Sequence, residues 1–174
     1  MKLKKYIIGI LTAFFMIFLL LISQGNIGVS KGNIEKDARK AHKIPEEWIT
    51  AKDVNNYLGA LLFYSEDLSN FTFSIYTNNE GLSFGYFFRL GGGIKEISDG
   101  ISKITSNGYG DIFLSLNNVQ VSRIEINDGE NIKEILIEDT KPFVVIIPED
   151  SREIRFYDIE GHSISDNLII ERKL

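Results

Sequence analysis

The chain of 174 residues contains no cysteine and only two histidines, three prolines and one tryptophan. The lack of cysteine excludes a disulfide framework and a lipid-modified N-terminal cysteine. Zinc sites built from three histidines, or from two histidines and a cysteine, are also excluded. Stability must therefore come from side-chain packing, and we expect neither a cofactor nor a bound metal.

Positive charge is scarce beyond the N-terminus. Residues 1–25 contain three lysines and no acidic residue, so the other 149 residues carry 24 acidic and 16 basic side chains, a net charge of −8. Nucleic acids and anionic lipids attract positively charged surfaces. The excess of acidic residues therefore argues against both as partners. The solubility that a net charge gives to a protein is a sufficient explanation for this excess.

The most distinctive stretch is the apolar run Tyr6–Ile22, which follows Lys2, Lys4 and Lys5. As a helix it would be about 25 Å long, slightly less than the roughly 30 Å of hydrocarbon in a bilayer. Flanking lysines stay in the cytoplasm, which places the rest of the chain outside. The run predicts a retained single-pass anchor in the cell membrane, or alternatively a signal peptide that is cleaved near Gly25, giving a secreted protein.

Three regions follow from these patterns. Residues 1–25 are the anchor or signal peptide, residues 26–43 a polar juxtamembrane linker, and residues 44–174 one extracytoplasmic β domain. A short helix over Ile34–His42 is predicted in the linker, without the apolar stripe needed for firm packing. A second short helix is predicted over Pro45–Asn55, because proline and acidic residues suit a first helical turn.

Beyond the linker the apolar residues recur with a period of two, which is typical of strands. Phe71–Thr77 and Leu82–Leu90 are predicted to pair across the turn Asn78–Gly81, and we expect their aromatic rows to form the centre of the core. The isoleucines of Ile94–Ile104 have helical spacing, but Gly100 also permits two short strands. We favour the helix.

Six further strands are predicted at close spacing. They are Asp111–Leu116, Val119–Ile126, Ile132–Glu138, Phe143–Ile147, Glu153–Tyr157 and Leu168–Glu171. The apolar phase slips by one residue at Ser122-Arg123, which predicts a β-bulge. The fold class is therefore mainly β, an antiparallel β-sandwich or barrel of about eight or nine strands with one or two short helices.

The C-terminal region Val121–Ile164 resembles the immunoglobulin-like β modules of exported Gram-positive bacterial proteins. The residues that carry the resemblance are Arg123-Ile124-Glu125-Ile126, Lys141-Pro142-Phe143, Ile154-Arg155-Phe156-Tyr157-Asp158 and Gly161. The whole chain is similar to membrane-anchored or secreted proteins of that group. The resemblance implies an immunoglobulin-like sandwich and brings no functional residue with it.

No catalytic, cofactor-binding or metal-binding residue can be assigned. His162-Ser163 near Asp158 or Asp166 lacks the Gly-x-Ser-x-Gly elbow of a hydrolase, so we interpret His162 as an exposed turn residue. The loop Asn127–Asn131 contains oxygen ligands but lacks the twelve-residue calcium pattern, and a hairpin turn explains it. His42 lies in the predicted linker.

Several aromatic residues would form a partner-binding patch if they were exposed, although we favour their burial. They are Tyr76, Tyr86, Phe87, Phe88, Tyr109 and Phe113.

We therefore predict a non-enzymatic binding or interaction module of the bacterial cell envelope. It would be held in the membrane through residues 6–22 and would contact another envelope protein. One alternative is an exported hydrolase that uses carboxylates. The other is a small regulatory membrane protein whose helix pairs in the bilayer, a role for which Gly9 and Ala13 give the small-residue spacing.

Overall fold

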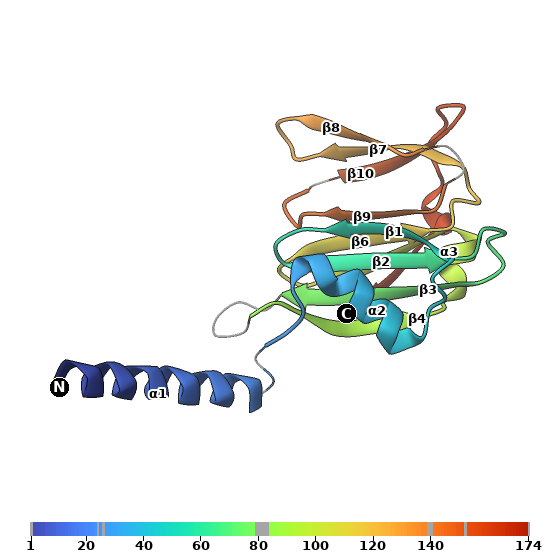
Figure 1. Ribbon diagram of the computed structural model, residues 1–174. Helices are drawn as coiled ribbons and strands as arrows, with labels where there is room; N and C mark the ends of the chain where they lie inside the picture. Colours follow the sequence, from blue (N-terminus) through green and yellow to red (C-terminus); the bar gives the residue numbers. More distant parts are fainter. Residues whose placement is uncertain are drawn as a thin grey trace.

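The computed structural model describes residues 2–23, 25, 27–78, 84–138, 141–151 and 153–173. The protein is mainly β, with 46% strand and 23% helix, and its sheets are antiparallel with a few short helices (Figure 1). The predicted fold class is confirmed at this level. The described residues contain eleven strands, more than the eight or nine expected.

The strands form three sheets. The N-terminal sheet has the order β1 (Ile49–Val54), β2 (Leu58–Tyr64), β3 (Phe71–Asn78) and β4 (Tyr86–Gly92). The central sheet has the order β11 (Ile169–Lys173), β5 (Ile101–Ser106), β6 (Gly110–Ser115) and β9 (Phe143–Ile147). The three-stranded sheet has the order β10 (Glu153–Asp158), β7 (Val121–Asn127) and β8 (Ile132–Leu136). All neighbouring strands are antiparallel except β11 and β5, which are parallel and so depart from the fully antiparallel expectation.

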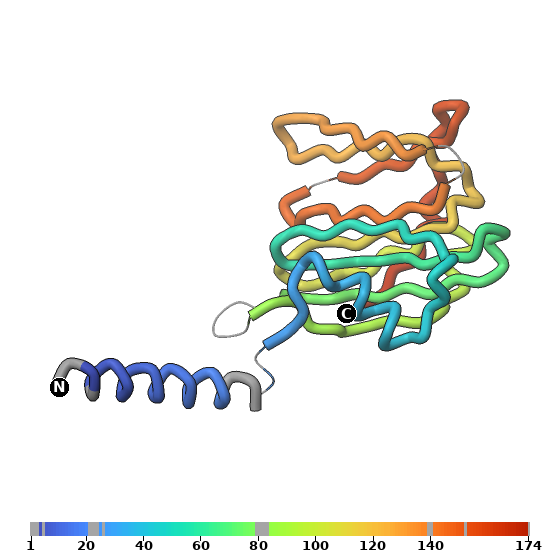
Figure 2. The backbone as a smooth tube through the Cα atoms, in the orientation of Figure 1, coloured from blue at the N-terminus to red at the C-terminus, as the bar shows by residue number. Residues whose placement is uncertain are grey.

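The described helices are short except for the first. They are α1 (Lys2–Ser23), η1 (Lys31–Asn33), α2 (Ile34–His42), α3 (Lys95–Asp99) and η2 (Asp166–Leu168). The chain path in Figure 2 runs from α1 along α2 into the N-terminal sheet and ends beside the central sheet. Among the described residues, no helix has the length and hydropathy required to cross a membrane.

Three apolar clusters hold these elements together. One lies between the N-terminal and central sheets and contains Leu62, Phe73 and Ile112. A second lies between the other face of the central sheet and the three-stranded sheet, around Ile124 and Phe156. The third lies between α2 and the outer face of the N-terminal sheet. The central sheet is therefore packed on both faces, which accounts for the continuous apolar sequence of β9.

The predicted helix over Pro45–Asn55 is wrong. Residues 49–54 are strand β1, which pairs with β2 along its whole length, from Ile49 opposite Tyr64 to Val54 opposite Gly59. The proline and acidic residues that suggested a helix occupy a turn before the strand. Pairing with a buried neighbour therefore outweighs the local helix signal.

Each alternative for Ile94–Ile104 is right for one half, because the first half is helix α3 and the second half is strand β5. The change comes at Gly100, where an added Cβ would lie 2.4 Å from the carbonyl oxygen of Leu168. The chain must pass close to that backbone at this point. A continuous helix is therefore the wrong prediction.

Helix α2 has the predicted bounds, but the expectation that it would not pack firmly is wrong. Ile34 and Ala38 are fully buried against Leu61, Phe63 and Tyr76 of the N-terminal sheet. Two apolar side chains one turn apart are enough here, because the sheet supplies most of the apolar surface.

The β3–β4 hairpin agrees with the prediction on one strand only. Phe73 and Ile75 are buried in the core, whereas Phe84 is 55% and Phe88 45% exposed. The register shifts at Ile75/Tyr76, so the predicted single-face row of β4 is broken by an irregularity. Leu82, the other end of that row, lies outside the described residues.

The bulge predicted at Ser122-Arg123 is confirmed. Tyr157 pairs with Arg123 and the next residue, Asp158, pairs with Val121, which leaves Ser122 as the extra residue of β7. The Ser122 hydroxyl donates a hydrogen bond to the carbonyl oxygen of Asp158 at 2.7 Å. The phase slip in the sequence is therefore a reliable sign of the bulge.

Candidate functional site

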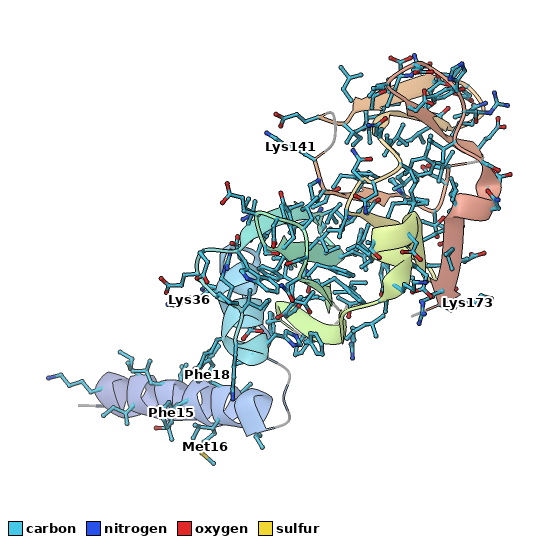
Figure 3. All side chains as sticks on the ribbon, turned by 90° about the vertical axis from the view of Figure 1, so that its right-hand side faces the viewer. Phe15, Met16, Phe18, Lys36, Lys141 and Lys173 are labelled. Carbon is cyan, nitrogen blue, oxygen red and sulfur yellow. The ribbon has the colours of Figure 1, made fainter. Side chains whose placement is uncertain are left out.

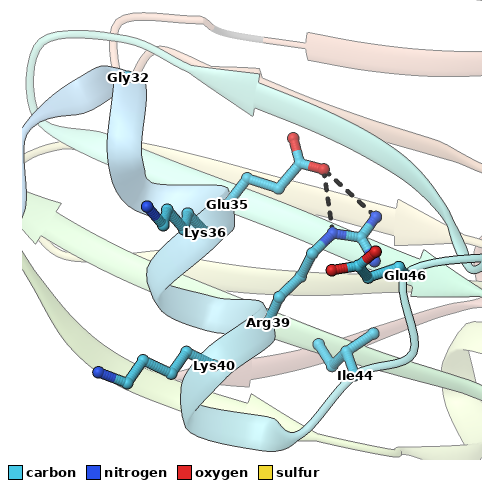
Figure 4. A pocket seen from close by; sticks show the side chains of 7 residues that line it. All are labelled: Gly32, Glu35, Lys36, Arg39, Lys40, Ile44 and Glu46. Atoms are coloured by element: carbon cyan, nitrogen blue, oxygen red, sulfur yellow. Dashed lines mark hydrogen bonds and ion pairs between the residues drawn. The ribbon is translucent and has the colours of Figure 1, made fainter.

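Two surface regions bring charged or apolar side chains together, and the first is a pocket along α2. It has a volume of about 620 Å³ and is shown in Figure 4. Its lining residues are Gly32, Glu35, Lys36, Arg39, Lys40, Ile44 and Glu46.

Arg39 dominates the inner wall of this pocket. Its guanidinium donates to the carbonyl oxygens of Pro45 at 2.8 Å and Trp48 at 2.9 Å. It also donates to Thr50 Oγ1 at 2.7 Å and to Glu35 at 3.3 Å. These bonds tie the turn before β1 to α2, so the inner wall is engaged in holding the fold and offers little to a ligand.

Glu35 completes the same network. One carboxylate oxygen accepts from Lys52 at 2.7 Å and the other from Thr50 at 3.0 Å. The hydrogen bond from Lys52 is the main cause that lowers the pKa of Glu35 below its ordinary value of 4.5, and partial burial opposes it. The carboxylate is thus held charged by its neighbours.

This lowered pKa predicts a pH dependence of stability. In acid the unfolded chain protonates Glu35 before the folded chain does, so the contribution of Glu35 is complete above pH 4.5 and is lost as the pH falls through the folded pKa. Glu35→Gln should therefore flatten the acid decline in the denaturation midpoint. Glu46→Gln is the control, since it removes an equal charge from the pocket and leaves the Lys52 bond intact. Equal acid slopes for wild type and Glu35→Gln would contradict the prediction.

The second region is the outward face of the three-stranded sheet. The inward residues of its strands pack on the central sheet, with Ile124 paired to Ile135 and to Phe156 on either side. Strand alternation therefore turns the intervening residues outward. These are Arg123, Glu125 and Asn127 on β7, Ile132, Glu134 and Leu136 on β8, and Glu153, Arg155 and Tyr157 on β10.

Polar side chains form a connected network at the centre of this face. The Tyr157 hydroxyl donates to Glu125 at 2.8 Å, and the Arg123 guanidinium lies 4.5 Å from the Tyr157 ring centroid. Arg123 also pairs with Glu125 at 3.2 Å and with Glu134 at 3.3 Å. The centre of the face is therefore polar and held in place, whereas its β8 border carries two exposed apolar side chains, Ile132 at 67% and Leu136 at 77%.

Strand β8 is an edge strand, and its hydrogen bonds show which backbone groups face outward. Asp128 donates to the carbonyl oxygen of Asn131, and Ile137 donates to that of Ser122, so these are hydrogen-bonded pairs. Such pairs alternate along an antiparallel ladder. The N–H and C=O groups of Ile132, Glu134 and Leu136 therefore point away from β7, and no strand in the described part of the chain pairs with them.

The other sheet edges differ from β8. Residues Ile27 and Val29 bridge to the start of β4, and residues 162–164 pair with β10 through bonds such as Ile164 N–H to Phe156 O at 2.8 Å. Asp53 accepts the N–H of Ile146 on β9 at 2.9 Å. β11 ends in charged residues, which protect an edge. Exposed apolar side chains also lie on β1, β4 and β11, but Ile132 and Leu136 on β8 are the most exposed ones of the described strands.

Comparison with protein-family models, with curated proteins and with solved structures finds no match to this chain. The resemblance of Val121–Ile164 to immunoglobulin-like modules therefore stays a prediction.

The residues considered for hydrolysis form an exposed turn. The His162 side chain is 72% exposed, and its Nδ1 lies 3.5 Å from Asp158 and 3.4 Å from Glu160. Asp158 accepts the backbone N–H groups of Glu160 and His162, and the bond from His162 is the main cause that lowers the pKa of Asp158. Ser163 bridges to Tyr157 through its backbone, so these residues act in closing the turn.

The loop Asn127–Asn131 is the β7–β8 hairpin turn. Asn127 Oδ1 accepts the N–H of Gly129 at 2.8 Å, and Asp128 Oδ1 accepts those of Glu130 and Asn131 at 2.9 and 2.7 Å. Within the described ranges, no group of three or more histidine, cysteine or carboxylate residues is placed to hold a metal ion. The side-chain oxygens that resembled calcium ligands serve to close the turn.

The aromatic residues divide between core and surface. Tyr76, Tyr86 and Phe113 are buried as expected, whereas Phe88 is not. Burial, together with a hydrogen bond donated to Asp37 at 2.8 Å, raises the pKa of Tyr76. Tyr109 is partly buried and stacks on Tyr57 at 5.5 Å. The aromatic residues therefore do not gather into one exposed patch.

Sequence reasoning missed both Arg39 and the β8 border. Arg39 stood in a mixed-charge stretch with nothing to distinguish it from its neighbours. For β8 a signal was present, because Ile132 and Leu136 fall on one face while Ile135 and Ile137 fall on the other. A strand that is apolar on both faces but lies at the end of a stack of sheets must expose one of them.

Proposed function

We propose that this protein is a membrane-anchored, extracytoplasmic binding module that captures an extended segment of another envelope protein along β8. The free edge of β8, with Ile132 and Leu136 exposed beside it, is the observation that carries the proposal. A bound segment would pair with the outward N–H and C=O groups, which gives affinity, while its alternate side chains would contact the two apolar residues.

The charged groups of the outward face support binding rather than hydrolysis. Glu125 and Glu134 are paired with Arg123, and Glu153 is paired with Arg155 at 2.7 Å. Carboxylates held in such pairs are suited to fixing a surface and steering a partner. A pair of carboxyl groups for glycoside hydrolysis would instead have to flank a sugar ring.

The exposed side chains of α1 support the anchoring role. Its large apolar residues between Tyr6 and Leu20 are exposed, and Met16 at 56% and Phe18 at 52% project from different sides (Figure 3). A helix that is apolar all round requires an apolar environment, and a bilayer provides one. The lysines before Tyr6 orient such a helix with the β domain outside.

The layered sheets support a sandwich-type core for that domain. Side chains from facing sheets fill the two inter-sheet clusters, as in proteins built from stacked β-sheets. The central sheet contributes side chains to both clusters. The three-stranded sheet therefore lies at one end of the stack, with its outward face open to a partner.

Photo-crosslinking in intact Gram-positive cells tests the proposal. With p-benzoylphenylalanine in place of Leu136, we expect a discrete adduct with one envelope protein. Adding Glu134→Pro should abolish this adduct, because proline removes an outward N–H without breaking a bond to β7. Ile49, an equally apolar strand residue that is 45% exposed, is the matched control position and should give no such adduct. An adduct that survives Glu134→Pro, or none at position 136, would overturn strand addition at β8.

A further inference from the structure

The charges of α2 are separated between its two sides. Both acidic residues face the sheet, where Glu35 accepts from Lys52 and Thr50, and Asp37 accepts from the Tyr76 hydroxyl at 2.8 Å. Arg39 is directed inward as well, with its guanidinium 5.0 Å from the centroid of the Phe63 ring. Both acidic side chains of α2 are therefore engaged in hydrogen bonds with the N-terminal sheet.

The outer side of α2 is positively charged. Lys36 and Lys40 lie one turn apart on one face of the helix, and Lys43, in a left-handed conformation, caps its C-terminal end. All three are exposed, as is Lys31 in η1, and among the described residues none of the four forms an ion pair or a side-chain hydrogen bond. Figure 4 shows Lys36 and Lys40 pointing away from Glu35 and Arg39, while Glu46 lies on the Arg39 side. We call these four residues the lysine face.

The lysine face lies on the part of the domain nearest to α1. Helix α1 ends at Ser23, and Ile27 and Val29 already bridge to the edge of the sheet at the start of β4. Only a few residues therefore separate α1 from the β domain. Such a connection spans at most about 3.5 Å per residue. In Figures 1 and 3 the three-stranded sheet lies at the opposite end of the molecule from α1, with α2 between them.

We propose that the lysine face binds the anionic phospholipid headgroups of the leaflet from which α1 emerges, and so holds the three-stranded sheet away from the membrane. This inference rests on the proposed anchoring by α1. Charge complementarity and the short tether argue for this occupant, since clustered lysines beside a membrane helix are attracted to anionic lipid. The net charge of −8 suggested the opposite, but it averages over two surfaces of different sign.

Lysine acetylation of the full chain in lipid nanodiscs tests the inference. With phosphatidylglycerol present, we expect the acetylation rates of Lys36, Lys40 and Lys43 to fall roughly five-fold relative to pure phosphatidylcholine. High salt should restore them, because it screens the attraction. Lys133, exposed on β8, is the internal control and should react equally in both lipids.

A second measurement reports orientation. The chain has no cysteine, so Glu134→Cys gives a single labelling site for energy transfer to a headgroup dye. Phosphatidylglycerol should reduce the transfer for the otherwise wild-type chain but not for Lys36→Glu/Lys40→Glu, and Lys133→Glu/Lys173→Glu is the charge-matched control. Equal acetylation and equal transfer in both lipids would overturn the lysine-face inference. A chain that elutes apart from the nanodiscs would instead overturn the anchoring itself, so the two failures are distinguishable.

Discussion

Replacing Phe73 with alanine is expected to lower the free energy of unfolding by about 3–5 kcal/mol. The Phe73 side chain is 1% exposed and lies in the cluster between the N-terminal and central sheets. Its removal takes a large apolar group out of the core and leaves a cavity that a close-packed interior fills only in part. Domains are commonly stable by about 5–15 kcal/mol, so this one change removes a large share of the total.

Phe84→Ala is the matched control for this prediction. The pattern of the sequence placed Phe84 in the core row that faces Phe73, yet its side chain is 55% exposed. We therefore expect a change within about 0.5 kcal/mol, as for most exposed substitutions. Urea denaturation followed by the fluorescence of the single tryptophan, Trp48, measures both variants. Equal losses for Phe73→Ala and Phe84→Ala would contradict the structural assignment.

Arg39→Ala is expected to cost about 2–4 kcal/mol, the second largest effect among the proposed changes. The variant loses three hydrogen bonds to the turn and to Thr50. The carbonyl oxygen of Trp48 loses its side-chain donor, and that of Pro45 keeps only the bond from the Trp48 N–H at 3.3 Å. The side chain is 21% exposed, so water can compensate only in part.

Arg39→Lys separates charge from geometry. Lysine keeps the positive charge but lacks the planar guanidinium that reaches several acceptors at once. We therefore expect Arg39→Lys to recover less than half of the stability that Arg39→Ala loses. Lys40→Ala is the neighbouring control and should stay within about 0.5 kcal/mol, because Lys40 is exposed and makes no contact of this kind in the described chain. Thermal denaturation at neutral pH compares the three variants. A wild-type midpoint for Arg39→Ala would show that the network contributes nothing.

Local patterns in the sequence predicted individual elements well. The bounds of α2 and of Phe143–Ile147 agree with the structure, and so does the bulge at Ser122. Each of these depends on the spacing of apolar residues within a few positions, which is a local property of the chain. Strand β1 was missed because its strand character depends on pairing with β2 and hardly on its own composition.

The arrangement of the sheets and the candidate site depend on contacts that are distant in the sequence. The residues around Leu136 show that β8 is apolar on both faces, but which face lies outward follows only from the place of β8 at the end of the stack. The hydrogen-bond acceptors of Arg39 likewise lie 6 to 11 residues further along the chain, and the turn between α2 and β1 brings them within reach. The net charge of the domain hid the lysine face for a related reason, because composition says nothing about which charges are paired.

The parallel pairing of β11 with β5 has a consequence for the order in which the protein can fold. Thr105 on β5 and Glu171 on β11 are 66 residues apart in sequence, and their side chains are hydrogen-bonded at 3.2 Å. Because the chain is synthesised from its N-terminus, β5 and β6 are complete well before β11 follows. The sheet between the two inter-sheet clusters gains its last strand only after residues 169–173 have been made, and non-local closure of this kind is slow. Until then the outer edge of β5 is unpaired and open to other strands.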